Sequence, residues 1–199
     1  MKFVSASAVI PRNHDKCYTV HEGYLTTQPG EHPTKFVPVG LSSKKQVTYG
    51  AGDPWLKVEF QTCPKLPEQA PSLDIYKGRI IVSGSSHTNG TITTPNCVTV
   101  SSPTAPNNGP FFLGVKRYAS ETNPPPSQRW EYGKDFGDVV YWVSPPSRGW
   151  VLTGASKGDE VGYTIDSQLN PVVEKGTRRI KLGCTVSCST FAIKAKNEL

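Results

Sequence analysis

Three of the four tryptophans stand next to turn-forming residues, where an aromatic ring can remain partly exposed. Trp142 and Trp150 flank the stretch VSPPSRG, and Trp55 follows GAGDP. A ring exposed at such a turn can stack on the apolar face of a sugar, because an indole combines a large apolar surface with one polar N–H group. The alternative is that these rings fill the ends of the core. The sequence leaves both alternatives open.

The sequence lacks the motifs that would supply a nucleophile, a catalytic metal or a phosphate-binding loop. It contains no Gly-x-Ser-x-Gly elbow, no His-Glu-x-x-His pair and no Gly-x-x-x-x-Gly-Lys loop. Ser85 and Ser86 stand near His87, but adjacent residues rarely form a nucleophile–base pair, and no orienting acid is indicated. Asp159 and Glu160 are neighbours in a turn, where a solvated loop explains them better than a glycosidase site. We therefore expect a protein that is not an enzyme and holds no metal or cofactor.

The composition favours a single all-β domain. The chain has 199 residues, which suits one domain, and 36% of them are hydrophobic, which is enough for one core. Glycine and proline, 18 of each, disfavour helix interiors. The net charge is +6, but the lysines and arginines are scattered and form no dense basic run. No segment reaches the length of a membrane span. Nucleic acid and membrane are therefore not the expected partners.

Similar stretches recur along the chain at intervals of roughly 55 to 65 residues. WLKVEFQTC (55–63) and RRIKLGC (178–184) share an apolar-Lys-apolar pattern ending in cysteine, and PFFLGVKRY (110–118) is a related apolar stretch. Each precedes a polar or proline-rich loop and a second short strand. In the proposed alignment those second strands are SLDIY (72–76), QRWEY (128–132) and STFAI (189–193).

Three β units of this size cannot each bury an apolar face alone, but they can do so when packed around a three-fold axis. The sequence therefore predicts a single β-trefoil of three pseudo-repeats with twelve strands, six of which close a barrel. In this arrangement Trp130 is expected to lie in the core beside Phe191 and either Leu73 or Ile75. A plain β-sandwich is the alternative, since short strands at this spacing also permit it.

The middle third resembles the ricin B-chain-like lectin group, which carries a Gln-x-Trp motif. The resemblance lies in NCVTVSS (96–102), PFFLGVKRY and SQRWEY (127–132), and the whole chain looks like the small secreted β-trefoil proteins of basidiomycete fungi. It implies that Trp130 is a core residue. It also implies that Gln128 supports a sugar site, at which the family places an Asp on the earlier strand to bind sugar hydroxyls.

The residues at the family's sugar-binding positions are changed in this chain. Thr99 stands where the family has its Asp, and Ser127 replaces the Asn before the glutamine. A carboxylate accepts stronger hydrogen bonds than a neutral hydroxyl does, so the resemblance implies a degenerate carbohydrate site with weak binding. That site would comprise Thr99, Ser127 and Gln128, with Trp142 as the nearest stacking ring. Restoring the acid with Thr99→Asp would then strengthen binding.

The five cysteines suit a secreted domain with one or two disulfides, and their spacing does not indicate a zinc site. In the ricin-like pattern a bridge links strands within one repeat. This implies a Cys17–Cys63 disulfide in the first unit. Cys97 lacks a partner in its own repeat, so it stays free or reaches Cys184 or Cys188.

Secretion is also suggested by the N-terminus and by a glycosylation sequon. Residues 1–8 combine a basic start with the small-residue end Ala6-Ser7-Ala8 of a signal peptide, although the long apolar middle is missing. They are either a remnant of such a signal or a disordered tail, and residues 9–199 form the domain. Asn89 begins the sequon NGT.

Together these features predict a secreted, monomeric, non-catalytic binding protein. A glycan is the first expected ligand. The alternatives are a protease inhibitor of trefoil type that acts through proline-rich loops, and a secreted protein that contacts another extracellular protein and takes no small ligand. The candidate inhibitory loops are LTTQPGEHPTK (25–35), SETNPPPS (120–127) and VSPPSRGW (143–150).

Overall fold

The structure is a computed structural model, and it describes only part of the chain. The described residues are 16–27, 36–49, 52–66, 75–83, 87–88, 91–92, 95–101, 110–135, 137–142, 150–152, 159–160, 162–164, 180–182 and 191–199. This part is all-β, as predicted, and holds no α-helix; its only helical turns are the 3₁₀ helices η1 (Pro126–Gln128) and η2 (Lys196–Glu198). Within the same residues, no helix is long and apolar enough to cross a membrane.

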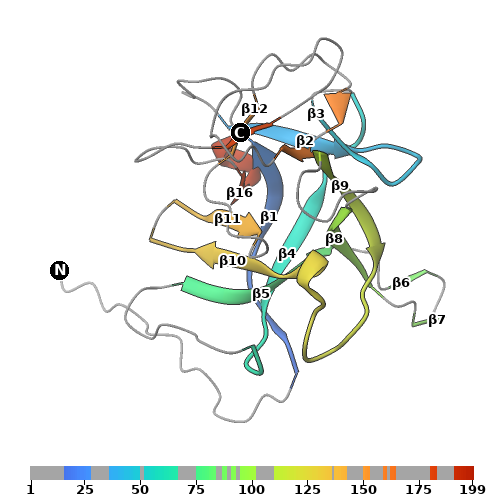
Figure 1. Cartoon of the computed structure of the whole chain (residues 1–199), viewed down its shortest axis with the longest axis vertical. Helices are drawn as coiled ribbons and strands as arrows, with labels where there is room; N and C mark the ends of the chain where they lie inside the picture. The colour runs from blue at the N-terminus through green and yellow to red at the C-terminus, as the bar shows by residue number, and fades with distance from the viewer. Residues whose placement is uncertain are drawn as a thin grey trace.

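Six strands close an antiparallel barrel. They are β1 (Tyr18–Thr27), β4 (Lys57–Thr62), β5 (Ile75–Val82), β10 (Trp130–Gly133), β11 (Val139–Trp142) and β16 (Phe191–Lys194). Each strand pairs with the next in this order, and β16 pairs with both β11 and β1, which completes the ring. In Figure 1, β1 and β4 run alongside each other through the centre, and the β10–β11 hairpin lies next to β5. A closed barrel leaves no sheet edge of its own exposed.

Further strands extend from the barrel, mostly as hairpins. They are β2 (Val37–Leu41), β3 (Val47–Tyr49), β6 (His87–Thr88), β7 (Thr91–Ile92), β8 (Asn96–Ser101), β9 (Pro110–Arg117), β12 (Trp150–Leu152), β13 (Asp159–Glu160), β14 (Gly162–Thr164) and β15 (Ile180–Leu182). Strand β2 pairs with β3, β8 pairs with β9, and β12 pairs with β15. The described residues thus form sixteen strands, and the predicted count of twelve is wrong. Three of the sixteen, β6, β7 and β13, are only two residues long.

The core lies inside the barrel and is built from alternate residues of its strands. On β10, Trp130 and Tyr132 point inward, and Trp130 is fully buried, as predicted. Phe191 on β16 belongs to the same core cluster. The largest fully buried side chains are Trp130, Phe60, Phe191, Leu25, Ile80, Leu113, Ile193 and Val39.

Of the two residues expected beside Trp130 and Phe191, Ile75 does not belong to the core. Ile75 is half-buried, lies outside the core cluster and pairs with Gly133 instead of Trp130, while Leu73 falls outside the described residues. Strand β4 contributes large inward side chains to the core, with Val58 and Phe60. Short apolar segments such as β4 and the start of β5 are not distinguished by periodicity alone.

Gly78 on β5 lies directly opposite Trp130 and has no room for a side chain. An added Cβ would collide with the carbonyl oxygen of Gln61 and lie 2.9 Å from the Cα atom of Thr62, and both contacts are backbone. We expect Gly78→Ala to lower the free energy of unfolding by about 3 kcal/mol, the upper part of the range for overpacking. Urea unfolding measures the loss.

The matched control for this prediction is Gly137→Ala. A Cβ on Gly137 would meet nothing within 4 Å, although its φ of +83° makes alanine strained there. This strain costs about 1 kcal/mol. A loss in Gly78→Ala no larger than that in Gly137→Ala would show that β4 and β5 approach less closely than described.

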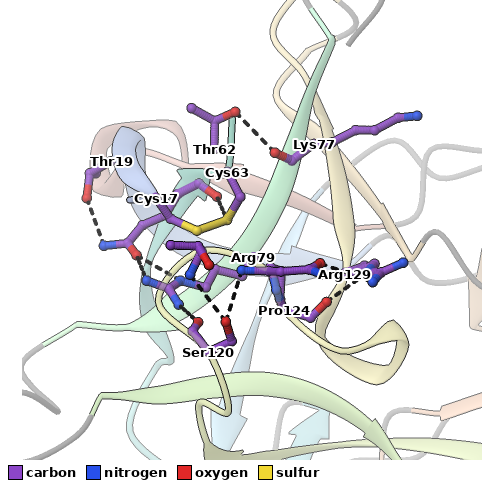
Figure 2. The surroundings of a disulfide bond; sticks show 12 residues. Cys17, Thr19, Thr62, Cys63, Lys77, Arg79, Ser120, Pro124 and Arg129 are labelled. Atoms are coloured by element: carbon purple, nitrogen blue, oxygen red, sulfur yellow. Dashed lines mark hydrogen bonds between the residues drawn. A yellow bond between two sulfur atoms is a disulfide. The ribbon is translucent and has the colours of Figure 1, made fainter. Parts of the chain in front are cut away.

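The disulfide joins Cys17 to Cys63, as predicted, and so links the chain just before β1 to the end of β4. Figure 2 shows the bond beside the side chain of Arg79. Cys97 on β8 is a free, buried thiol, one of the two outcomes expected for it. Cys184 and Cys188 lie outside the described residues, as do residues 1–8 and Asn89.

Burial of Cys97 determines how its thiol titrates. Burial raises its pKa from 9.0 to about 12, although the positive charge of Arg79 opposes the rise. Because the folded pKa is the higher one, the stability contributed by the protonated thiol is complete below about pH 9 and is lost as the pH rises toward 12. The fraction of thiolate at pH 8 should be roughly a thousandfold lower in the folded protein than in the unfolded chain.

We therefore expect Cys97 of the folded protein to react with iodoacetamide at pH 8 at least about 100-fold more slowly than in urea, since the thiolate is the reactive form. Mass spectrometry of the peptide that contains Cys97 measures this rate. The stability of the wild type should also fall between pH 9 and 11, and it should fall less in Cys97→Ala. Equal labelling rates with and without urea would contradict the described burial.

Candidate functional site

The structure brings Thr99 and Gln128 together, although they are 29 residues apart in the chain. The side-chain amide of Gln128 donates to the Thr99 hydroxyl oxygen at 3.0 Å and to the carbonyl of Arg117 at 3.2 Å. The Thr99 hydroxyl donates in turn to the carbonyl of Cys97 at 3.0 Å. These bonds join the 3₁₀ helix η1 to the β8–β9 hairpin.

Both side chains are buried, which does not fit the expected sugar pocket. Thr99 and Gln128 are each 3% exposed, so they offer almost no surface to a sugar. Next to them, the indole N–H of Trp130 donates to the carbonyl of Val98 at 3.2 Å. Ser127 is half-buried at the edge of this group. With this burial, Thr99→Asp would place a carboxylate in the core, so a gain in sugar affinity is no longer expected from it.

The expected stacking ring is also buried. Trp142 is 6% exposed, pairs across the strands with Trp130, and donates its indole N–H to the carbonyl of Pro126 at 2.8 Å. It fills the core, which is the alternative the sequence left open. Trp55, by contrast, is 48% exposed and lies at the surface. The side chain of Trp150 lies outside the described residues.

The outer face of the barrel has a hollow next to these buried residues. Since Trp130 and Trp142 point inward, their neighbours on β10 and β11 point outward. Glu131 lies opposite Tyr141, and Gly133 lies opposite Ile75 of β5. The cavity there has a volume of about 210 Å³ and is lined by Ile75, Glu131, Gly133 and Tyr141; we call it the Gly133 hollow. Because Gly133 has no side chain, it leaves a depression between the longer side chains around it.

The Gly133 hollow combines apolar walls with two polar groups. Glu131 supplies a carboxylate, which is 3.7 Å from the ammonium group of Lys77 on β5. Burial raises the pKa of the Tyr141 hydroxyl, and the charge of Glu131 raises it further. Tyr141 therefore stays protonated at neutral pH and can donate a hydrogen bond, while the carboxylate can accept several. This arrangement can bind a small hydroxylated molecule, but it lacks the nucleophile–base geometry of a catalytic site.

The sequence pattern indicates that Glu131 and Tyr141 face outward. In WEYG and VVYW, an inward tryptophan forces the adjacent residue outward. The resemblance implied Trp142 as the nearest stacking ring, but Trp142 points inward, and the outward aromatic side chain of β11 is its neighbour Tyr141. A shift of one residue along a strand exchanges the two faces.

A second group of polar side chains closes one part of the barrel wall. Asp138, in the left-handed conformation (φ 60°), accepts a hydrogen bond of 2.7 Å from the Tyr132 hydroxyl. The ammonium group of Lys194 lies 3.6 Å from its other oxygen. His21 stacks on Tyr132 and donates from Nε2 to the carbonyl of Ile193 at 2.9 Å. Burial and the bond to Asp138 raise the pKa of Tyr132. These contacts join β1, β10 and β16, and the packing of these three strands explains them.

Arg79 holds a loop against the barrel near the disulfide (Figure 2). It is 5% exposed, and its guanidinium donates to the side-chain oxygen of Gln61 at 3.0 and 2.8 Å and to the carbonyl of Ser120 at 2.5 Å. Burial lowers its pKa, but a guanidinium remains charged at neutral pH. Arg129 donates to the carbonyl of Pro124 at 2.7 Å. The loop of residues 118–129 is therefore firmly held.

The described residues contain no group of three or more His, Cys, Asp or Glu side chains that could hold a metal ion. The described residues form an all-β protein built on a closed six-stranded antiparallel barrel, and a small hollow lies on its outer face. No protein-family model, curated protein or solved structure matches the chain.

Proposed function

We propose that the barrel is a β-trefoil, in which each unit consists of a barrel strand, a hairpin and a second barrel strand. The order of elements supports this proposal. Along the chain, the β2–β3 hairpin comes between β1 and β4, and the β8–β9 hairpin comes between β5 and β10. In the third unit, β14 and β15 come between β11 and β16 in the sequence. These two strands lie close together in space. Under this scheme Trp130 and Phe191 occupy equivalent strands.

We further propose that the protein is a secreted, non-catalytic glycan-binding module, and that the Gly133 hollow is its sugar site. The observation that carries this proposal is the pairing of Glu131 with Tyr141 across β10 and β11, beside the gap left by Gly133. The disulfide between Cys17 and Cys63 favours an extracellular location, because such bonds persist mainly in oxidising compartments.

The chemistry of the hollow suits one sugar ring. A carboxylate that accepts from two neighbouring hydroxyls forms charge-assisted bonds, roughly twice as strong as neutral ones. Glu131 thus supplies the kind of acceptor that Thr99 does not. The Tyr141 ring and Ile75 can cover the apolar face of the sugar. At 210 Å³ the hollow is smaller than the roughly 300–1,000 Å³ of typical ligand pockets, so a single ring with modest affinity is expected.

A glycan array followed by calorimetric titration of the best neutral oligosaccharide tests this proposal. Glu131→Gln should weaken binding by about 10-fold or more, the scale of a hydrogen bond to a charged group. Tyr141→Ala should weaken it at least as much. The matched control is Glu59→Gln, which removes an outward carboxylate from β4 instead. Absence of any glycan ligand, or affinity that survives both changes in the hollow, would refute the proposed site.

The second candidate function is binding of a protease or another extracellular protein through loop 118–129. Its support is the set of bonds from Arg79 and Arg129 to the loop backbone, because a pre-ordered loop loses little entropy on binding. Glu121 and Asn123 are exposed on this loop. A protease-inhibition panel with wild type and Asn123→Ala tests it, and inhibition without glycan binding would favour it over the hollow. Residues 28–35 and 143–149, from the other two candidate loops, lie outside the described part.

A further inference from the structure

Trp55 is the one large hydrophobic side chain that is exposed among the described residues, at 48%. Its ring meets the ring of Tyr24 edge to face, with centroids 5.7 Å apart and planes at 83°. Edge-to-face contact is a favoured geometry for two aromatic rings. We call this pair the Trp55–Tyr24 platform. It lies on β1 and the segment leading into β4, whereas the Gly133 hollow lies on β5, β10 and β11.

The backbone next to Trp55 is hydrogen-bonded to two neighbouring strands. Leu56, the next residue, is buried, and its N–H donates to the carbonyl of Val39 at 2.9 Å. Its own carbonyl accepts from the N–H of Leu25 at 3.0 Å. These bonds tie Trp55 to both β1 and β2, so stacking a ligand on the indole would require little ordering of the protein.

Lys57 supplies a positive charge beside the platform. Lys57 is exposed, lies opposite Tyr24, and shares the outward face with Trp55 because the two are separated by one inward residue. Lys194 flanks Tyr24 on β16, but its ammonium group already faces Asp138. Lys57 is therefore the lysine at the platform that can meet a ligand.

Acidic residues limit where an anion could sit. Glu22 and Glu59 lie opposite each other on the same outward face, two residues along the strands from Tyr24 and Lys57. Two residues of strand span about 7 Å. An anionic group on a ligand stacked over Trp55 would therefore be attracted at the Lys57 end and repelled beyond it.

We propose that the Trp55–Tyr24 platform is a separate binding site for an anionic sugar, one that carries a carboxylate or a sulfate group. The sugar ring stacks on the indole of Trp55, and the anionic group pairs with the ammonium of Lys57. This differs from the Gly133 hollow, whose lining carries a carboxylate and disfavours anions. The inference does not depend on the hollow, because it rests on other strands and other residues.

Calorimetric titration with three tetrasaccharides tests the inference: an oligogalacturonate, a sulfated heparin fragment and neutral cellotetraose. At least one anionic tetrasaccharide should bind at 0.15 M salt, and more tightly than the neutral one. Trp55→Ala and Lys57→Gln should each weaken this binding by about 10-fold or more. The anionic probe that binds more tightly identifies the ligand's anionic group as a carboxylate or a sulfate.

Two controls separate this site from general attraction to a basic protein and from the hollow. Lys116→Gln removes another exposed lysine, on β9, and should change affinity by less than about two-fold. Glu131→Gln should leave binding of the anionic sugar intact. The inference is overturned if neither anionic probe binds, if Lys116→Gln weakens binding as much as Lys57→Gln does, or if Trp55→Ala has no effect.

Discussion

Replacing Trp130 with alanine is expected to lower the free energy of unfolding by about 3–5 kcal/mol, the cost of removing a large aromatic side chain from a core. Trp130 is completely buried, and it sits between Gly78 on β5 and Trp142 on β11. The substitution would leave a cavity at the centre of the barrel. It would also leave the carbonyl of Val98 without the indole bond at 3.2 Å.

Urea unfolding of wild type and Trp130→Ala measures this loss. The control is Trp55→Ala, which removes the same side chain from a position where it is 48% exposed, and it should cost no more than about 1–1.5 kcal/mol. Similar losses in the two variants would contradict the placement of Trp130 in the core.

Removing the disulfide is expected to cost about 4 kcal/mol, by the chain-entropy estimate for a loop of this length. The bond connects residues separated by 46 positions, so it restricts a large part of the unfolded chain. It also fastens the chain at the start of β1 to the end of β4, two strands that pair along most of their length.

The double variant Cys17→Ser/Cys63→Ala, compared with wild type in urea with and without dithiothreitol, tests this prediction. Reductant should destabilise the wild type strongly and the double variant much less. Cys97→Ala is the matched control, since Cys97 is a free thiol, and it should retain the full response to reductant. A wild type that is insensitive to reductant, or non-reducing peptide mapping that pairs Cys17 elsewhere, would contradict the assignment.

Composition and turn residues were sufficient to predict an all-β protein, whereas the buried Trp130 and the Cys17–Cys63 pair were implied by the resemblance to the Gln-x-Trp lectins. Neither identified β4, with Val58 and Phe60, as a source of core side chains. Short apolar strands resemble one another, and only the pairing of β4 with both β1 and β5 distinguishes them.

The candidate site was harder to predict than the fold. Thr99 and Gln128 meet as expected, yet the tight packing of η1 on β8 buries them, and burial cannot be read from two residues in a sequence. On the β10–β11 hairpin the outward aromatic side chain is Tyr141 and not Trp142, because Trp142 pairs with the inward Trp130. The hollow itself exists because three strands bring Ile75, Gly133 and Tyr141 together, which local patterns do not encode.

Amide chemical-shift mapping by NMR, during titration with the best neutral glycan, tests the proposed sugar site most directly. The largest shifts are expected at Glu131, Gly133 and Tyr141, in the Gly133 hollow. The amide of Thr99 and the indole N–H of Trp130 should move little, because both residues are buried. Largest shifts at Thr99 and Gln128, or no shifts with any neutral glycan, would contradict the account.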